Sequence, residues 1–155
     1  MPGANLSRTT KVFLVDDHAL VREHLAALLQ DEADLEVCGE AADAPTARTL
    51  IGQRQPDLVV LDISLKGSDG FELLKDLQAS QPNLPVLMLS MHDEMLYAER
   101  ALRAGARGYI TKEDASVNML GAIRQVLAGQ VFLSERMAAR WEEKQLGKAR
   151  EGLAL

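Results

Sequence analysis

The sequence has little cysteine, no long apolar run and no excess of positive charge, and each absence excludes a class of protein. Cys38 is the only cysteine among 155 residues, so the chain cannot form an internal disulfide. No apolar segment approaches 18 residues and no signal peptide opens the chain, which predicts a cytoplasmic protein without membrane contact. The net charge of −6 and the pI of about 5.1 argue against direct binding to nucleic acid.

The length and composition predict one globular domain followed by a tail. With 47% hydrophobic residues, a chain of this size can bury enough apolar surface to fold without disulfides or a structural metal. Residues 1–10 are polar and contain proline and glycine, so we expect a disordered lead-in. The domain is predicted over residues 11–130, and a linker with a helical tail over residues 131–155.

Two short apolar runs end in carboxylates. The four apolar residues of Leu58–Leu61 precede Asp62, and so long a run predicts a strand that is buried on both faces of a parallel sheet. A second apolar strand, Lys11–Val15, is followed directly by Asp16 and Asp17. Because ligand sites of open parallel sheets lie beyond the carboxyl ends of the strands, these three acids are candidate site residues.

Strands and helices alternate along the rest of the chain. Further strands are expected at residues 36–41, 85–89 and 107–110, and helices at residues 19–30, 44–54, 71–80, 94–104 and 116–128, with a loop at residues 63–70. The alternation predicts an α/β fold, namely a flavodoxin-like, doubly wound, five-stranded parallel sheet of order 2-1-3-4-5 with a C-terminal helical extension. This order brings Ser90 and Lys112, which follow the fourth and fifth strands, to the same edge as the acids.

The predicted cluster of acids requires a cation. Two negative charges ~4 Å apart repel each other by roughly 4 kcal/mol at an effective dielectric constant of 20. Three carboxylates with room for water are typical ligands of Mg²⁺ or Mn²⁺. His18 and His92 lie near the acids and raise the alternative of zinc, but their spacing fits no zinc finger, so solvated histidines are the more typical interpretation.

The quoted stretches together resemble the receiver domain of two-component response regulators, most closely the NarL/FixJ subfamily. The resemblance runs from about residue 11 to residue 129 and is carried by residues 12–18, 62–70, 89–90 and 105–112. Lys66 and Glu113 stand where many receivers have proline. In the subfamily, a helix-turn-helix domain follows the receiver, and the residues after Gly129 are too few for it. Ser134 is instead expected to cap a helix over residues 135–141.

The resemblance implies a phosphorylation switch rather than an enzyme with an external substrate. Asp62 would be the phosphoryl acceptor, and a sensor histidine kinase or a phosphotransfer protein would be the donor. The resemblance assigns Mg²⁺ to Asp16, Asp17, Asp62 and the backbone carbonyl of Ser64, and it assigns the phosphoryl group to Ser90 and Lys112. The implied output is transcription regulation, with a phosphorylation-enhanced homodimer.

Two further expectations concern the switch and its lifetime. On phosphorylation, Ser90 should move inward and Tyr109 should turn from exposed to buried. Ser64, Met91 and His92 lie beside the path of the hydrolysing water, and Met91 is bulky enough to slow the loss of the phosphoryl group.

Two other functions remain as alternatives. A Mg²⁺-dependent phosphatase of the haloacid dehalogenase type also uses an aspartate at a strand end, but it needs a second acid two residues later, where this chain has Ser64. Multiple turnover on a phosphate monoester would favour that enzyme. An interaction module that works without phosphorylation is the other alternative, and the complete set of acids, hydroxyl and lysine argues against it.

Overall fold

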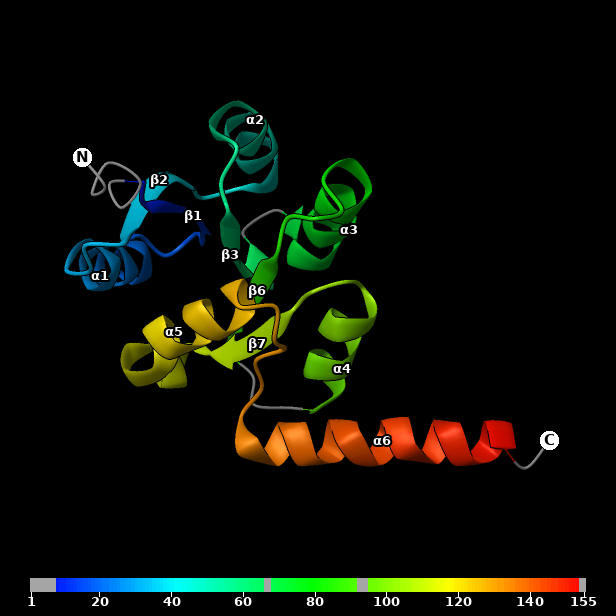
Figure 1. The fold of residues 1–155 in the computed structure, drawn as a ribbon. Helices are drawn as coiled ribbons and strands as arrows, with labels where there is room; N and C mark the ends of the chain where they lie inside the picture. The colour runs from blue at the N-terminus through cyan, green and yellow to red at the C-terminus, as the bar shows by residue number, and fades with distance from the viewer. Residues whose placement is uncertain (1–7, 66–67, 92–94, 154–155) are drawn as a thin grey trace.

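The computed structural model describes residues 8–65, 68–91 and 95–153, and it shows a parallel sheet between two layers of helices (Figure 1). The elements are, in chain order, β1 (Thr10–Val15), α1 (Ala19–Gln30), β2 (Leu35–Ala41), α2 (Ala44–Arg54), β3 (Leu58–Asp62), β4 (Ser64–Leu65), β5 (Ser68–Asp69), α3 (Gly70–Ser80), β6 (Val86–Ser90), α4 (Met95–Arg103), β7 (Gly108–Thr111), α5 (Lys112–Leu127) and α6 (Glu135–Leu153).

The strand order of the main sheet is β2-β1-β3-β6-β7, and every neighbouring pair is parallel. The predicted order 2-1-3-4-5 is therefore confirmed. Val15 pairs with Leu61, so the residues that follow them, Asp16 and Asp62, leave the sheet side by side. Ser90 pairs with Thr111 at the ends of β6 and β7, which places Lys112 at the same edge.

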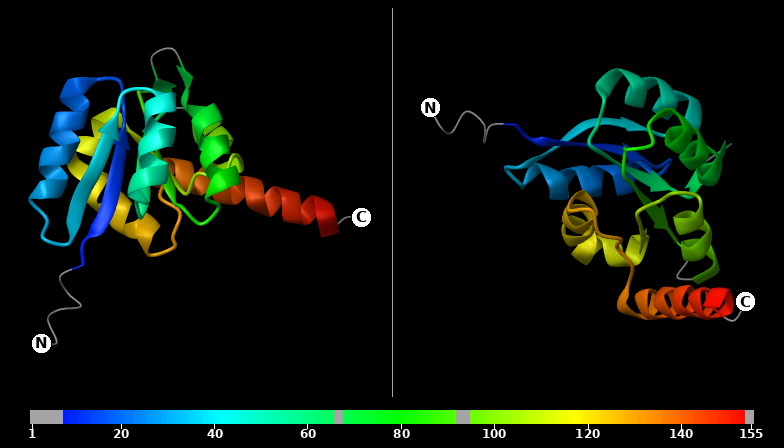
Figure 2. Two further views of the ribbon diagram at one scale, coloured as in Figure 1. Left: turned by 90° about the horizontal axis from the view of Figure 1, so that it is seen from above. Right: turned by 45° about the vertical axis from the view of Figure 1, so that its right-hand side comes forward.

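Side chains alternate between the two faces of the central strands, and each face has its own apolar core. On one face, Val12 and Leu14 pack with apolar residues of α1 and α5; on the other, Phe13 and Val15 pack with residues of α2, α3 and α4. The views in Figure 2 show the same division of the helices into two layers. Burial of strands on both sides is what their unbroken apolar runs predicted.

Most boundaries lie within one residue of the predictions, and three larger or more informative differences precede the tail. The segment expected to be a loop at residues 63–70 contains a small hairpin of β4 and β5. Helix α5 begins at Lys112 rather than at Ser116, because the Thr111 hydroxyl accepts a hydrogen bond from the Asp114 N–H (3.1 Å) and caps the helix. Strand β1 already begins at Thr10, which the predicted lead-in included; residues 1–7 lie outside the described residues.

The tail runs along the edge of the sheet and then forms a helix longer than predicted. The Phe132 carbonyl accepts a hydrogen bond from the Tyr109 N–H (3.0 Å), which attaches the linker to β7. Ser134 caps α6 as predicted, since its hydroxyl accepts a hydrogen bond from the Met137 N–H (3.3 Å). The helix then continues to Leu153 and extends away from the domain (Figure 1). Among the described residues, no helix is long and apolar enough to span a membrane.

Candidate functional site

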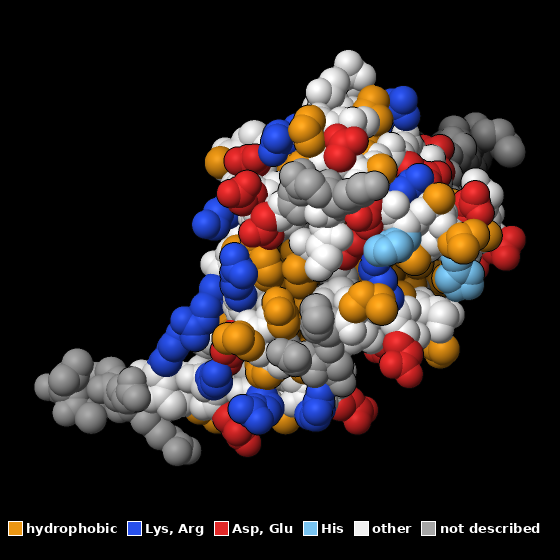
Figure 3. All heavy atoms as spheres, turned by 180° about the vertical axis from the view of Figure 1, so that it is seen from behind, with side chains coloured by type: hydrophobic (Ala, Val, Ile, Leu, Met, Phe, Trp, Pro, Cys, Tyr) orange, Lys and Arg blue, Asp and Glu red, His pale blue; other side chains and the backbone are white. Residues whose placement is uncertain are grey.

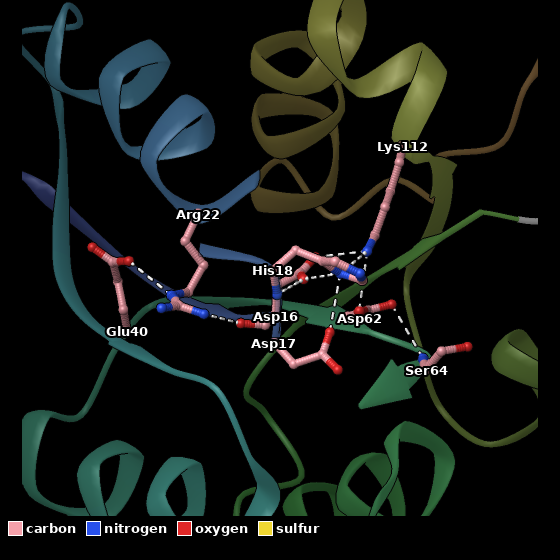
Figure 4. Close-up of polar contacts among 8 residues, drawn as sticks. All are labelled: Asp16, Asp17, His18, Arg22, Glu40, Asp62, Ser64 and Lys112. Carbon is pink, nitrogen blue, oxygen red and sulfur yellow. Dashed lines mark hydrogen bonds and ion pairs between the residues drawn. The ribbon is translucent and has the colours of Figure 1, made fainter. Parts of the chain in front are cut away.

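The carboxyl ends of β1, β3 and β7 bring two aspartates and a lysine into contact (Figure 4). The Lys112 Nζ lies 3.1 Å from Asp16 Oδ2 and 3.1 Å from Asp62 Oδ2. The exposed fractions of the three side chains are 10%, 2% and 1%, respectively. Charges this deeply buried must satisfy one another, so the lysine is fixed between the two carboxylates.

Asp17 and His18 complete the cluster. The His18 Nδ1 lies 3.0 Å from Asp16 Oδ1, 3.0 Å from Asp17 Oδ1 and 3.1 Å from Lys112 Nζ. The backbone N–H of His18 also donates a hydrogen bond to Asp16 Oδ1 (2.8 Å), and this turn directs the imidazole back toward the acids. The His18 side chain is 59% exposed, which agrees with the expected solvated histidine, but its contacts with the acids were not predicted. Its position directly after two acids was the available signal.

The local charges shift the pKa values of the acceptor candidate and the lysine. Burial, together with the nearby Asp16 carboxylate, raises the pKa of Asp62 to about 6, although the Ser64 N–H and Lys112 act in the opposite direction. Burial works against the charged form of Lys112, but Asp62 and Asp16 outweigh it and raise the lysine pKa above its ordinary value. One lysine is therefore not enough to neutralise this group of acids.

The residues present fit a divalent cation. Asp16 Oδ2 and Asp17 Oδ1 are buried, and neither accepts a hydrogen bond of normal geometry from the described residues. One ligand atom each from Asp16, Asp17, His18 and Asp62 lies within 4.8 Å of all the others. Hard carboxylate oxygens with unused lone pairs are suited to Mg²⁺. The backbone of Ser64 lies beside this cluster of ligand atoms, because its N–H donates a hydrogen bond to Asp62 Oδ1 (3.1 Å).

The segment after Asp62 folds back onto the strand that carries this residue. The Gly70 N–H donates a hydrogen bond to the Ile63 carbonyl (2.9 Å), and a β carbon at Gly70 would lie 2.4 Å from the Asp62 carbonyl oxygen. The Asp69 carboxylate accepts a hydrogen bond from the Phe71 N–H (2.9 Å) and begins α3. Glycine is therefore required where the chain crosses behind the site.

Arg22 supports the site from α1, and no motif in the sequence could have identified it. Its guanidinium donates hydrogen bonds to the Asp16 backbone carbonyl (2.5 Å) and to the Glu40 carboxylate (3.2 Å) (Figure 4). These contacts fix the backbone at Asp16 between α1 and β2.

The remaining predicted residues lie near the cluster but differ in exposure. Ser90 and Tyr109 are both about 1% exposed, so the expected outward position of Tyr109 is not what this structure has. A strand that is buried on both faces has no solvent side for this ring to occupy. Met91 is 71% exposed, and Ser64 is exposed as well. His92 lies outside the described residues.

Three acids and a lysine lie at the carboxyl edge of a sheet of this strand order. Comparison with protein families identifies the class of protein that has this arrangement. The model of the response regulator receiver domain matches residues 12–124, and the chain belongs to this family. The chain is 38% identical over 128 residues to the response regulator GacA of Pseudomonas aeruginosa, covering 83% of this chain and 60% of the relative. It is 37% identical over 139 residues to the DNA-binding transcriptional activator DevR/DosR of Mycobacterium tuberculosis, covering 90% and 64%. The chain thus spans less than two thirds of these relatives.

Solved structures support a NarL/FixJ-like receiver within the family. A two-component response regulator of the LuxR family from Aurantimonas sp. SI85-9A1 superposes with a TM-score of 0.82 at 34% identity, covering 89% of this chain and 99% of that chain. The signal receiver domain of the putative response regulator NarL from Mycobacterium tuberculosis gives a TM-score of 0.74 at 30% identity, covering 79% and 99%.

Proposed function

We propose that the chain accepts a phosphoryl group on Asp62 from a sensor histidine kinase or a phosphotransfer protein. The observation that carries this proposal is the environment of the Asp62 carboxylate, with one oxygen held by the Ser64 N–H and the other beside the Lys112 ammonium. A carboxylate with a pKa of about 6 is mainly anionic at neutral pH, so it can act as a nucleophile without a general base.

Each neighbouring group has a role in this proposal. Asp16, Asp17, Asp62 and the Ser64 carbonyl would hold Mg²⁺ or Mn²⁺. A bound divalent cation supplies the positive charge that offsets repulsion between Asp62 and the incoming phosphoryl group. Lys112 is the fixed cation for the remaining phosphoryl charge, and the Ser90 hydroxyl donates a hydrogen bond to a phosphoryl oxygen.

The test is the mass of the intact protein after incubation with acetyl phosphate and Mg²⁺. We expect one added phosphoryl group that is stable in acid and labile in base. Asp62→Asn and removal of the metal by EDTA should each abolish the gain, whereas Asp76→Asn, a matched change at an exposed acid paired with Arg48, should not. Labelling that persists in Asp62→Asn or in EDTA would contradict the mechanism. Multiple turnover on a phosphate monoester would favour a phosphatase of the haloacid dehalogenase type instead.

We further propose transcription regulation as the output, through a homodimer that phosphorylation favours. The support is the likeness to DevR/DosR, which is described as a DNA-binding transcriptional activator, together with exposed apolar side chains near the site. Leu20 on α1 is 79% exposed and Val117 on α5 is 81% exposed, and such residues can pair across a twofold axis. Sedimentation that shows only monomer at high concentration, with and without the phosphoryl group, would reject the dimer.

We propose that the phosphoryl group decays slowly because Met91 narrows the approach of water. Ser64 and His92 are the other two residues predicted to lie beside the approach of the hydrolysing water. Neither offers the carboxylate or amide group that positions water well. Met91→Ala should therefore speed the loss of the label without preventing phosphorylation. Leu96→Ala is the control, because Leu96 is 70% exposed on α4. An unchanged rate in Met91→Ala contradicts the proposal.

A further inference from the structure

Helix α6 begins beside β7 and runs past α4 (Figures 1 and 2), and its contacts with this face include Met137 and Lys144, which lie in its first three turns. Met137 is the one α6 side chain among residues 135–148 that is fully buried, with 2% exposed. Trp141, one turn later, is half-buried, and the side chains of residues 142–148 are all exposed. The attachment of α6 therefore depends on very few side chains.

The apolar part of this attachment involves Tyr109. Met137 and Tyr109 belong to the same apolar cluster, which also contains Ala98 and Ala101 of α4. The two side chains also line one cavity of about 640 Å³ between β7, the start of α5 and α6. If the Tyr109 ring left its buried position, Met137 would lose part of the surface on which it packs.

The polar part of the attachment is an ion pair between Lys144 of α6 and Glu99 of α4. Glu99 is only 8% exposed, so its carboxylate is buried. Figure 3 shows Lys and Arg side chains gathered along the part of the molecule that leads to its C-terminal end. Removing the lysine would leave the buried charge without this partner.

The same short helix α4 also contacts the segment that follows Asp62. Arg100, the next residue after Glu99, places its guanidinium 3.9 Å from the centre of the Phe71 ring. It also lies 3.9 Å from the Asp69 carboxylate. Successive residues of α4 therefore contact α6 on one side and the start of α3, behind the site, on the other.

We propose that the docking of α6 depends on the state of the Asp62 site. The helix docks on α4 and β7 while Ser90 and Tyr109 point inward, and it loosens when these side chains turn outward. This inference rests on the proposed phosphorylation of Asp62. Ser90 and Tyr109 are buried in the same structure in which Met137 is buried, so the two arrangements are compatible. A phosphoryl group that holds Ser90 inward therefore favours the docked helix, and by linkage the docked helix favours loading of the site.

Trp141 makes the docking measurable, because it is the only tryptophan of the chain and lies half-buried on α6. Its emission and its quenching by acrylamide report whether α6 is docked. In the full chain, Mg²⁺ with beryllofluoride, a mimic of the phosphoryl group, should lower the quenching. Asp62→Asn should show no such change. Phosphorylation that is proved by mass but leaves the quenching of Trp141 unchanged overturns the proposal.

Charge reversal tests the ion pair separately. Lys144→Glu should increase the undocked population roughly tenfold, which corresponds to about 1.4 kcal/mol, and should increase the quenching of Trp141. Glu99→Lys should do the same, and the double exchange should restore protection. Lys148→Glu, the same change one turn further at an exposed position, is the matched control. If Glu99→Lys does not fold, the comparison of Lys144→Glu with Lys148→Glu tests the ion pair alone. Equal quenching of Trp141 in these two variants contradicts the proposal.

Reciprocity separates this proposal from the phosphorylation chemistry. If docking and loading are coupled, Lys144→Glu should weaken docking more in the loaded protein than in the free protein. The beryllofluoride concentration needed for half-loading should then rise by the ratio of these two effects. If the wild-type chain gains no phosphoryl mass, the proposed function fails, while the charge-reversal experiment still reports on the docking. If the mass is gained but half-loading does not respond to Lys144→Glu, the coupling alone fails.

Discussion

The acidic edge of the sheet and the α4–α6 contact both contain a buried carboxylate paired with a lysine, but they differ in how firmly the pair is held. At the edge, Lys112 lies between Asp16 and Asp62, and all three side chains are at most 10% exposed. At the α4–α6 contact, the Lys144 side chain is 43% exposed. Fully buried charges fix geometry at a cost to stability, whereas a pair with one half-exposed partner is screened by water and can open. The first arrangement suits a reaction site, and the second suits a contact that responds to it.

The largest expected effect tests how rigid the site is. Gly70→Ala would place a β carbon 2.4 Å from the Asp62 carbonyl oxygen and 2.7 Å from the Ile63 carbonyl oxygen. We expect the free energy of unfolding to fall by about 3 kcal/mol, the upper end for overpacking. Gly121→Ala in α5 is the control, because its β carbon would meet no atom within 4 Å outside its own stretch of helix, and it should gain up to about 1 kcal/mol. Denaturant midpoints that shift alike in both variants would contradict this view.

A second prediction measures the stability cost of burying Asp62. Its pKa is raised, so the folded state binds a proton more tightly than the unfolded state, and stability is lost as the pH rises from about 4 through about 6. Asp62→Asn removes this cost, so without divalent cations it should be more stable than wild type by about 1–3 kcal/mol above pH 6. The two stabilities should converge below pH 4. An equal gain at pH 3 and pH 8 would exclude this cause.

The same titration should control metal affinity. Protons and Mg²⁺ compete for Asp62. The apparent dissociation constant of Mg²⁺ should therefore rise roughly tenfold for each pH unit below about 6, which is a loss of about 1.4 kcal/mol of binding free energy. Calorimetric titration between pH 5 and pH 8 measures this slope. Asp62→Asn should flatten the slope, and a wild-type affinity that is independent of pH would show that Asp62 is not a ligand.

The smallest effect is expected at a half-exposed group of ion pairs on the surface. Arg124 contacts Glu32 at 2.8 Å and Asp34 at 3.0 Å, but its side chain is 44% exposed. Arg124→Ala should lower the free energy of unfolding by less than about 1 kcal/mol, and the loss should shrink with added salt. A loss as large as that of Gly70→Ala would mean that exposure does not decide the strength of ion pairs in this chain.

The sheet and the position of three candidate site residues at one edge could be predicted from the sequence, because both follow from simple patterns. Unbroken apolar runs marked the parallel strands, and the strand order alone brought Asp16, Asp62 and Lys112 to one edge. The start of α5 was missed although a signal was present, since Thr111 and Asp114 have the spacing of a helix cap.

Other features had no local signal. Strands β4 and β5 have two residues each, which is too short for any periodicity to show. The burial of Tyr109 depends on α4 and α6, which cover its face of β7, and alternation cannot reveal this. Residues 142–148 of α6 all have exposed side chains, so burial against the domain gave no pattern from which the length of this helix could be predicted.

The length of α6 has a mechanical consequence. A helix of 19 residues is about 28 Å long, and the segment 145–153, beyond the ion pair of Lys144 with Glu99, makes up about 14 Å of it. Such a helix is a lever arm with its pivot at Met137 and Ser134. A tilt of about 10° at the pivot would displace the far end by about 5 Å, given the rise of 1.5 Å per residue. A side-chain movement too small to alter the domain's outline could in this way be amplified at the C-terminal end of α6.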